Sequence, residues 1–186
     1  PFSATIKARV FSREKGTKLM IEASIPKFLT GQNIVGVEAL FEPCKQLIFA
    51  VLEQMRIEPT AAERRKINRG KFEMKRVDYA LHCACGTPER AAALIAAIRS
   101  LMYAKAKDPG SYGDETVYAG QHSNRWTFRI YRKDFEIKKR GRGLPANVYG
   151  RDYLIAKVQN CARMELVLRA PELWRLGLTD PLAWAV

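Results

Sequence analysis

Apolar and polar residues alternate along several stretches of the chain, a period of two that is typical of β-strands with one buried face. Alternation over Ala4–Phe11 and Lys18–Ser24 predicts two strands joined by a turn at Ser12–Gly16. The proline and glycines of Ile25–Gly36 predict a loop. A longer strand is predicted over Lys71–Cys85. The first half of the chain thus contributes three strands.

The second half of the chain repeats this alternation. Strands are predicted at Thr116–Ala119, Arg125–Lys133 and Ala162–Arg169, and the polar turn Gly120–Asn124 joins the first two. Asp108–Gly113 predicts a loop, whereas the basic, glycine-containing stretch Lys138–Gly150 has no clear periodicity.

Apolar residues at helical spacing separate the predicted strands. This spacing runs over Val37–Arg56, where Pro43 favours a helix that becomes regular only near that residue. An alanine-rich helix is predicted at Pro88–Ala104, with Thr87 as its N-cap. Shorter helices are predicted at Arg151–Gln159 and Pro171–Leu176.

Strands and helices mix without the strand–helix–strand rhythm of a parallel sheet. We therefore predict an α+β fold, in which a central antiparallel sheet has helices packed on one face. A length of 186 residues and a hydrophobic content of 47% suit a single domain over residues 1–186. Because the chain opens at Pro1 rather than Met, we expect a fragment of a longer protein or a processed chain.

The charge of the chain points to a polyanionic partner. Lys and Arg number 32 against 19 Asp and Glu, which gives a formal charge of +13 and a pI near 9.8. Such an excess favours nucleic acid first and an anionic membrane second. No apolar run is long enough to span a bilayer, and we expect neither a signal peptide nor a membrane partner. Many small proteins are basic without binding DNA, and charge alone does not decide the matter.

The four cysteines do not indicate a zinc site. Cys44, Cys83, Cys85 and Cys161 lack the paired two-residue spacing that such sites use. The simplest interpretation is reduced core cysteines in a cytosolic protein.

Three of the predicted strands carry an unusual polar face. Residues two apart in a strand point the same way. One face of each strand is apolar, and the other carries chemically active side chains. These are Asp78 and His82 in the first strand, Arg125, Arg129 and Tyr131 in the second, and Arg163, Glu165 and Arg169 in the third. A solvated face would explain polarity alone, but it does not explain why metal-ligand residue types stand beside arginines and a tyrosine.

This set of side chains permits a narrow range of chemistry. Two carboxylates and an imidazole can hold Mg²⁺ or Mn²⁺, which would orient a phosphate for in-line attack. A tyrosine phenolate is a competent nucleophile, and arginines bind phosphate bidentately. Because free tyrosine ionises near pH 10, we expect a cation such as the metal, Lys133 or Arg129 to favour ionised Tyr131.

Four segments resemble a known family. TVYAGQHSNRWTFRIYRKDFE (116–136) is similar to the tyrosine motif of rolling-circle plasmid initiators and of the gene II replication proteins of filamentous phages. RVDYALH (76–82) resembles the family's Arg-x-Asp strand, and CARMELVLR (161–169) resembles its Arg-x-Glu strand. IEASIPKFLTGQNIVG (21–36) is similar to a signature of the phage branch. The segments keep the family's order and spread over the whole chain.

The resemblance implies a fold like that of the HUH endonucleases, metal-dependent nicking of single-stranded origin DNA, and work beside the host helicase and polymerase in the bacterial cytoplasm. It implies that Tyr131 attacks the scissile phosphate and leaves a 5′-phosphotyrosine and a free 3′-OH. Asp78, His82 and Glu165 are the positions that match its metal ligands. The chain departs from the wider superfamily in lacking a two-histidine motif, because His82 and His122 are its only histidines. Whether a second nucleophile completes strand joining stays open.

Basic residues around and after the tyrosine strand are candidates for DNA binding, with Lys133 placed beside the reaction. A basic loop is often only solvated, but this one follows a candidate nucleophile and contains glycines that would let it move. The candidates are Arg125, Arg129, Arg132, Lys138, Lys139, Arg140, Arg142 and Arg163, together with Lys27 and Asn33 near the N-terminus, where Gln32 and its neighbours could equally be turn residues.

Two alternatives belong to other classes. A DNA-binding module that recognises an origin or a single strand without cutting would show the same basic face and salt dependence. An RNA-binding sheet would stack bases on exposed aromatics, whereas Trp126 and Phe128 are predicted to face the helices. Tyr118, Tyr149 and Tyr153 are fallback nucleophiles, and Asp78 and Glu165 could instead form plain ion pairs with Arg76 and Arg163. Only the nuclease would form a covalent adduct that Tyr131→Phe abolishes.

Overall fold

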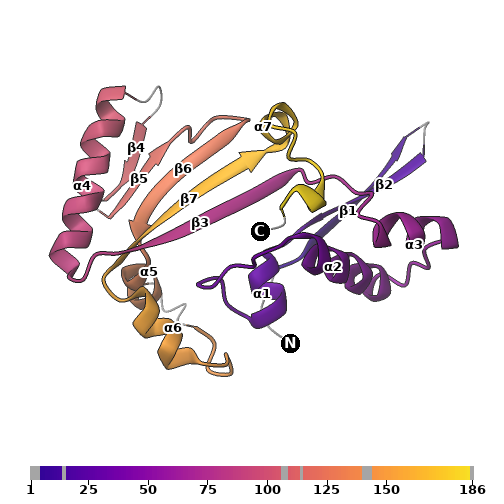
Figure 1. The fold of residues 1–186 in the computed structure, drawn as a ribbon, viewed down its shortest axis with the longest axis horizontal. Helices are drawn as coiled ribbons and strands as arrows, with labels where there is room; N and C mark the ends of the chain where they lie inside the picture. Colours follow the sequence, from indigo (N-terminus) through magenta and orange to yellow (C-terminus); the bar gives the residue numbers. More distant parts are fainter. Residues whose placement is uncertain (1–4, 14–15, 106–108, 114, 140–143, 185–186) are drawn as a thin grey trace. The chain divides into compact units, whose positions relative to one another are not determined.

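The computed structural model describes residues 5–13, 16–105, 109–113, 115–139 and 144–184, which form two compact units (Figure 1). Unit 1 is Pro1–Glu73 with Asp180–Val186, and unit 2 is Met74–Thr179. Each unit is described by itself. The prediction of one domain over residues 1–186 stays a prediction.

Unit 1 contains a β-hairpin and a small group of helices. The strands β1 (Lys7–Arg13) and β2 (Gly16–Glu22) pair antiparallel, with Arg9 opposite Met20. The helices are α1 (Ile25–Thr30), α2 (Phe41–Gln54), α3 (Ala61–Asn68) and the 3₁₀ turn η1 (Pro181–Trp184). Leu47, Val51 and Leu52 of α2 are buried, which is the face that the helical spacing of apolar residues predicted.

Two helices of unit 1 differ from the sequence prediction. The segment predicted as a loop contains α1, because Pro26 suits the first turn of a helix and Gly31 ends it with φ 74° and a backbone hydrogen bond to Lys27. Helix α3 was not predicted, although its N-terminus has a capping box in which Thr60 and Glu63 satisfy each other's backbone N–H groups.

Unit 2 is an antiparallel five-stranded sheet in the order β3-β7-β6-β5-β4. This confirms the α+β class, while likeness to the HUH endonucleases stays a prediction. The strands are β3 (Arg76–Ala84), β4 (Pro109–Tyr112), β5 (Thr116–Ala119), β6 (Trp126–Arg132) and β7 (Cys161–Arg169), and the helices are α4 (Pro88–Lys105), α5 (Lys133–Lys139), α6 (Arg151–Val158) and α7 (Ala170–Arg175).

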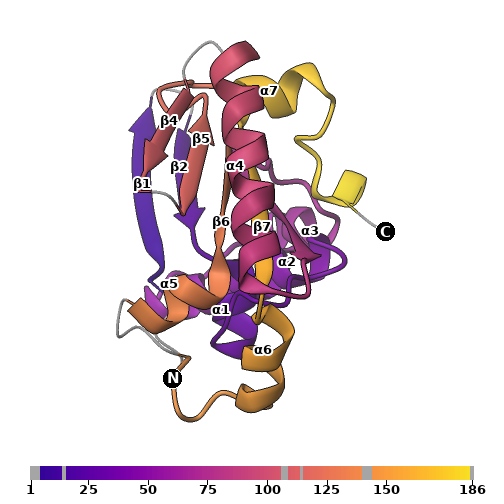
Figure 2. The same ribbon diagram turned by 90° about the vertical axis from the view of Figure 1, so that its left-hand side faces the viewer.

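Helix α4 covers the apolar face of the sheet and contacts β4, β5, β6 and β7 (Figure 2). The centre of this core is fully buried and consists of Ile95 of α4 with Val117, Ile130 and Ala162 of three strands. Phe128 packs against it, as its strand face predicted, but Trp126 near the strand end is partly exposed. The edge strand β3 is largely uncovered on this side, where Tyr79 and Leu81 are exposed.

Two boundaries in unit 2 correct the sequence prediction. The segment predicted as the loop Asp108–Gly113 contains β4, which pairs with β5 from Pro109 opposite Ala119 onward. Lys133 is the first residue of α5 rather than the last residue of a strand. Asp134 and Glu136 follow it in the first helical turn, where acidic side chains favour a helix N-terminus.

Within the described part of the chain, no helix has the length and apolar character needed to cross a membrane.

Candidate active site on the polar face of the sheet

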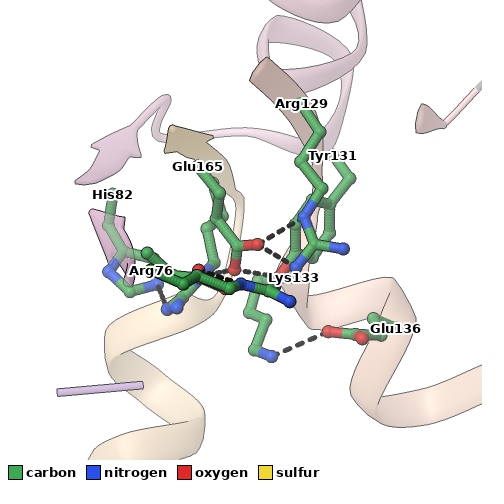
Figure 3. Close-up of polar contacts among 9 residues, drawn as sticks. Arg76, His82, Arg129, Tyr131, Lys133, Glu136 and Glu165 are labelled. Carbon is green, nitrogen blue, oxygen red and sulfur yellow. Dashed lines mark hydrogen bonds and ion pairs between the residues drawn. The ribbon is translucent and has the colours of Figure 1, made fainter. Parts of the chain in front are cut away.

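Strand register brings the predicted polar side chains of β3, β6 and β7 onto one face. Tyr131 of β6 lies opposite Arg163 of β7, and Arg163 lies opposite His82 of β3. One step along the sheet, Arg129 lies opposite Glu165. Because side chains directly opposite in neighbouring strands share a face, the predicted juxtaposition is confirmed for these five residues. We refer to Tyr131, Arg129, Arg163, Glu165 and His82, together with Lys133 of α5, as the Tyr131 cluster (Figure 3).

Glu165 is the centre of the Tyr131 cluster. Its Oε1 accepts a hydrogen bond of 2.9 Å from the phenol of Tyr131 and one of 2.6 Å from Nε of Arg163. Its Oε2 accepts from Arg129, which also forms an ion pair with it. One carboxylate thus holds two guanidinium groups and the tyrosine in place, and Figure 3 shows the side chains of Arg129 and Tyr131 directed toward it.

Two further contacts enclose Tyr131. The guanidinium of Arg129 lies 5.6 Å from the centre of the phenol ring, and Nζ of Lys133 lies 5.8 Å from it. Nζ of Lys133 also donates a hydrogen bond of 2.7 Å to Glu136 within α5. Because α5 begins directly after β6, the strand-to-helix junction places this ammonium beside the ring. The sequence analysis did not identify Glu136 as the partner of Lys133. The available signal was the spacing of three residues, at which a lysine and a glutamate can pair on a helix.

The Tyr131 cluster is largely withdrawn from solvent. Tyr131 is 8% exposed and Glu165 is 4% exposed, and Arg163 and Lys133 are buried as well. An enclosed site of this kind strengthens electrostatic interactions. A phosphate could reach the phenol only after the side chains that cover it have moved.

The pKa values of the cluster follow from burial and from its charges. Burial raises the pKa of Tyr131 far above its usual value, and the carboxylate of Glu165 adds to the rise. Burial also raises the pKa of Glu165, but Arg129 and Arg163 outweigh it and hold that pKa below its usual value. The phenol is therefore protonated in this arrangement. Burial and Glu165 outweigh the lowering effect of Arg163 on this pKa, and the expectation that a cation such as the metal, Lys133 or Arg129 favours ionised Tyr131 stays a prediction.

The two nitrogen bases respond to the same environment. Burial, with help from the charges of Arg163 and Lys133, lowers the pKa of His82 to about 4. Its Nε2 lies 3.0 Å from Nη1 of Arg163, and a neutral imidazole suits that neighbour because it can accept this hydrogen bond. Burial also lowers the pKa of Lys133, although Glu136 opposes the change.

The three predicted metal ligands do not form a ligand group in this arrangement. Both oxygens of Asp78 accept hydrogen bonds from Arg76, at 2.7 and 2.8 Å, while Glu165 is engaged by two arginines and Tyr131. His82 faces Arg163 instead of a carboxylate. Among the residues that the structure describes, no three His, Cys, Asp or Glu side chains gather as a metal site would require. These side chains as arranged do not fit a divalent ion, and the metal stays a prediction.

The predicted DNA-binding residues fall into separate groups. Arg129 and Arg163 lie in the Tyr131 cluster. Arg125 pairs with Glu172 at 2.9 Å, and Arg132 pairs with Asp134 at 2.8 Å on the opposite face of β6. Lys27 and Asn33 belong to unit 1. There the buried side chain of Gln32 stabilises a turn, because its Oε1 accepts hydrogen bonds from the backbone N–H groups of Ile34 and Val35. Arg140 and Arg142, and the side chains of Lys138 and Lys139, lie outside the described residues.

The fallback tyrosines lie elsewhere. Tyr118 of β5 is opposite Arg129 on the polar face, whereas Tyr149 and Tyr153 are exposed at the start of α6. His122 is exposed in the turn between β5 and β6. Of the tyrosines that the structure describes, Tyr131 is the one that donates a hydrogen bond to Glu165.

Comparison with known proteins assigns the chain to a family. The model of a family described as the N-terminal part of a phage replication-associated protein, of the gene II type, matches residues 1–185. The chain belongs to this family. A curated relative, the replication-associated protein of Enterobacteria phage I2-2, is 28% identical over 180 residues, which cover 92% of this chain and 50% of the relative. The chain thus spans about half the length of the relative that it matches. No solved structure matches the chain.

Membership of this replication-associated family confirms the resemblance to the phage replication proteins. The match covers both units, so the hairpin and helices of unit 1 belong to the family as much as the sheet of unit 2. The comparisons assign no role to individual residues.

Proposed function

We propose that this member of the phage replication-associated family is the nicking part of a rolling-circle replication initiator, a site-specific endonuclease for single-stranded DNA whose nucleophile is Tyr131. The observation that supports the proposal is the position of Tyr131. It is held on a polar sheet face by Glu165 and flanked by three cations, Arg129, Arg163 and Lys133. A tyrosine in strand packing alone would need none of these charges.

In the proposed reaction the phenol oxygen of Tyr131 attacks the scissile phosphorus. A bond forms between this oxygen and the 5′-phosphoryl group, and the bond from phosphorus to the 3′ oxygen breaks. The proton lost by the phenol is balanced by the one gained by the 3′ oxygen, which leaves as a hydroxyl. Oε1 of Glu165 already accepts a hydrogen bond from that phenol. Attack by the new 3′-OH on the phosphotyrosine would reverse these steps and rejoin a strand.

The cations have a second role in the proposal. Two arginines paired to one carboxylate can exchange it for a phosphate, because guanidinium groups bind both anions bidentately. Arg129 and Arg163 would then stabilise the charge that develops on the phosphoryl oxygens. Lys133 would stay beside the phenol and offset the negative charge of its oxygen as the proton leaves.

Two parts of the proposal rest on the family resemblance and not on contacts in the structure. Asp78, His82 and Glu165 stay predicted ligands of Mg²⁺ or Mn²⁺, and no step above passes through the metal. We propose that the whole protein acts on origin DNA in the bacterial cytoplasm, together with the host helicase and polymerase. The chain itself matches about half the length of its relative.

A labelled oligonucleotide tests the function. The chain is incubated with single-stranded oligonucleotides tiled across the origin of its own replicon, in separate arms with Mn²⁺, Mg²⁺ and a chelator. We expect one oligonucleotide to give a protein–DNA band that survives a denaturing gel. We also expect a phosphotyrosine at residue 131 in the digested adduct. The chelator arm tests the metal separately.

Matched variants make the result specific. Tyr131→Phe should abolish the adduct, whereas Tyr118→Phe, on the same sheet face, should keep it. If the oligonucleotides bind and no adduct forms in any arm, the chain is a DNA-binding module and the nicking proposal is wrong. An adduct that persists in Tyr131→Phe would move the nucleophile to another residue.

A further inference from the structure

Two tyrosines are exposed near the N-terminus of α6, Tyr149 just before the helix and Tyr153 in its first turn. Tyr149 is 98% exposed and Tyr153 is 65% exposed. Tyrosine rings are large and mainly apolar, and they usually bury much of their surface. Leu154 and Val158 hold the helix against unit 2 by their buried side chains, so the exposed rings are not required to anchor α6.

Two basic residues and one acidic residue are exposed beside Tyr153 on α6. Nζ of Lys157 lies 5.7 Å from the ring centre of Tyr153, and Arg151 is exposed earlier on the same helix. The other exposed positions of α6 are Asp152 and Ala156. A protein interface would favour further apolar groups beside the aromatics. Exposed aromatic rings with Lys and Arg are instead the combination that binds unpaired bases and their phosphates.

The end of α6 lies next to the strand that carries Glu165. The thiol of Cys161, the first residue of β7, donates a hydrogen bond of 3.2 Å to the carbonyl of Lys157. Arg163 follows two residues later and belongs to the Tyr131 cluster. Helix α6 also contacts α5, which begins at Lys133. A strand of DNA that leaves Tyr131 could therefore reach α6 within unit 2.

We propose that Tyr149, Tyr153 and Lys157, called here the α6 strip, form a stacking site for unpaired bases that flank the scissile phosphate. Each ring would stack on one base, and Lys157 would attract a neighbouring phosphate. This inference rests on the proposed function and adds the place where the single strand is held. It also accounts for exposed tyrosines that the nicking chemistry does not use.

Binding is measured with the whole chain in the Tyr131→Phe background, so that no covalent adduct interferes. The probe is a fluorescent single-stranded oligonucleotide that contains the nicking site, followed by anisotropy. Tyr149→Ala and Tyr153→Ala should each weaken binding by roughly five- to a hundredfold, since loss of one base–aromatic stack has about that effect. Tyr153→Phe, which keeps the ring, should bind like its parent. A duplex of the same sequence should show little change.

Trp174 supplies the matched control. It is 79% exposed on α7, so Trp174→Ala also removes an exposed aromatic from unit 2. We expect binding of the oligonucleotide to be unchanged by it. Equal losses in Trp174→Ala and Tyr153→Ala would overturn the proposal, as would unchanged binding in both tyrosine variants.

Abasic oligonucleotides separate stacking from a structural effect. One base at a time is removed around the nicking site, and the loss of affinity is compared between the parent protein and its Tyr153→Ala variant. At the position that stacks on Tyr153, base removal should cost affinity only when the ring is present. If every abasic position costs the same in both proteins, no base stacks on this ring and the proposal is wrong.

The two proposals can fail separately. Proteins that retain Tyr131 are tested for adduct formation on the same oligonucleotide. An adduct without any coupling between Tyr153 and a base would leave the nicking function standing and remove the α6 strip. Coupling without an adduct would leave the strip as a single-strand site in a protein that does not nick. Circular dichroism melts of each variant show whether the fold is kept.

Discussion

The phenol of Tyr131 donates a hydrogen bond of 2.9 Å to Oε1 of Glu165, and the same carboxylate accepts hydrogen bonds from Arg129 and Arg163. Glu165 therefore has two effects on one sheet face. It neutralises guanidinium groups that would otherwise repel each other, and it fixes the direction of the phenol. The same carboxylate therefore contributes to the stability of the fold and to the orientation of the proposed nucleophile.

Glu165→Gln should destabilise the chain by about 3 kcal/mol, because removal of one partner leaves buried positive charge without compensation. The free energy of unfolding is measured by urea titration. Asp152→Asn is the control in unit 2, since Asp152 forms an exposed pair with Arg151 and should change stability by less than about 1 kcal/mol. Equal effects of the two substitutions would show that the pairs around Glu165 contribute no more than a surface contact.

Lys133→Met should slow adduct formation by about a hundredfold, comparable to the loss of one group that stabilises developing charge. The substitution removes the ammonium that lies 5.8 Å from the centre of the Tyr131 ring and keeps a side chain of similar length. The rate is measured in single turnover on the uncut oligonucleotide that contains the nicking site. Glu136→Gln keeps the ammonium and removes only its partner, so its rate should stay closer to that of the parent. A parental rate in Lys133→Met would remove this residue from the mechanism.

The polar face could be predicted because it depends only on alternation. In β3, β6 and β7 the side of each residue follows from its position in the strand, and the apolar partners Met164 and Ile130 fixed which side met the helix. Register was not in the pattern, because sliding a strand by two residues keeps its apolar residues on the same face. The sequence therefore predicted which residues belong to the polar face, whereas the pairs that lie opposite one another came from the structure.

Other features depended on contacts that periodicity does not encode. The strand β4 carries glycine and proline and is defined by its pairing with β5. Helix α1 is short and its start is set by Pro26. The choice between two roles was also not decided by the pattern: Asp78 and Glu165 were assigned to a metal, with ion pairs to Arg76 and Arg163 as the alternative, and the structure has these ion pairs. A sequence does not distinguish a carboxylate that binds a metal from one that pairs with an arginine.

Ile95→Ala should destabilise the chain by about 3 kcal/mol, within the range found for large apolar residues in packed cores. Ile95 is fully buried in α4 against Val117, Ile130 and Ala162. Leu101→Ala, on the exposed side of the same helix, should cost less than about 1 kcal/mol. Thermal melts of both variants provide the measurement. If the two variants melt together, the packing of α4 on the sheet is not the main support of unit 2.

The stability of the chain should fall with acid through His82. Burial and the charges of Arg163 and Lys133 lower its folded-state pKa to about 4, whereas an unfolded histidine titrates near 6.5. Below about pH 6.5 His82 therefore binds a proton in the unfolded chain, whereas in the folded chain it binds one only near pH 4. The free energy of unfolding should fall over this window by at most about 1.4 kcal/mol per pH unit from this residue.

In His82→Gln that contribution is absent, so the stability of the wild type relative to the variant should be constant above about pH 6.5 and decline below it. His122→Gln, which removes an exposed histidine, controls for loss of an imidazole elsewhere. A stability difference between wild type and His82→Gln that did not change with pH would contradict the half-buried, neutral imidazole.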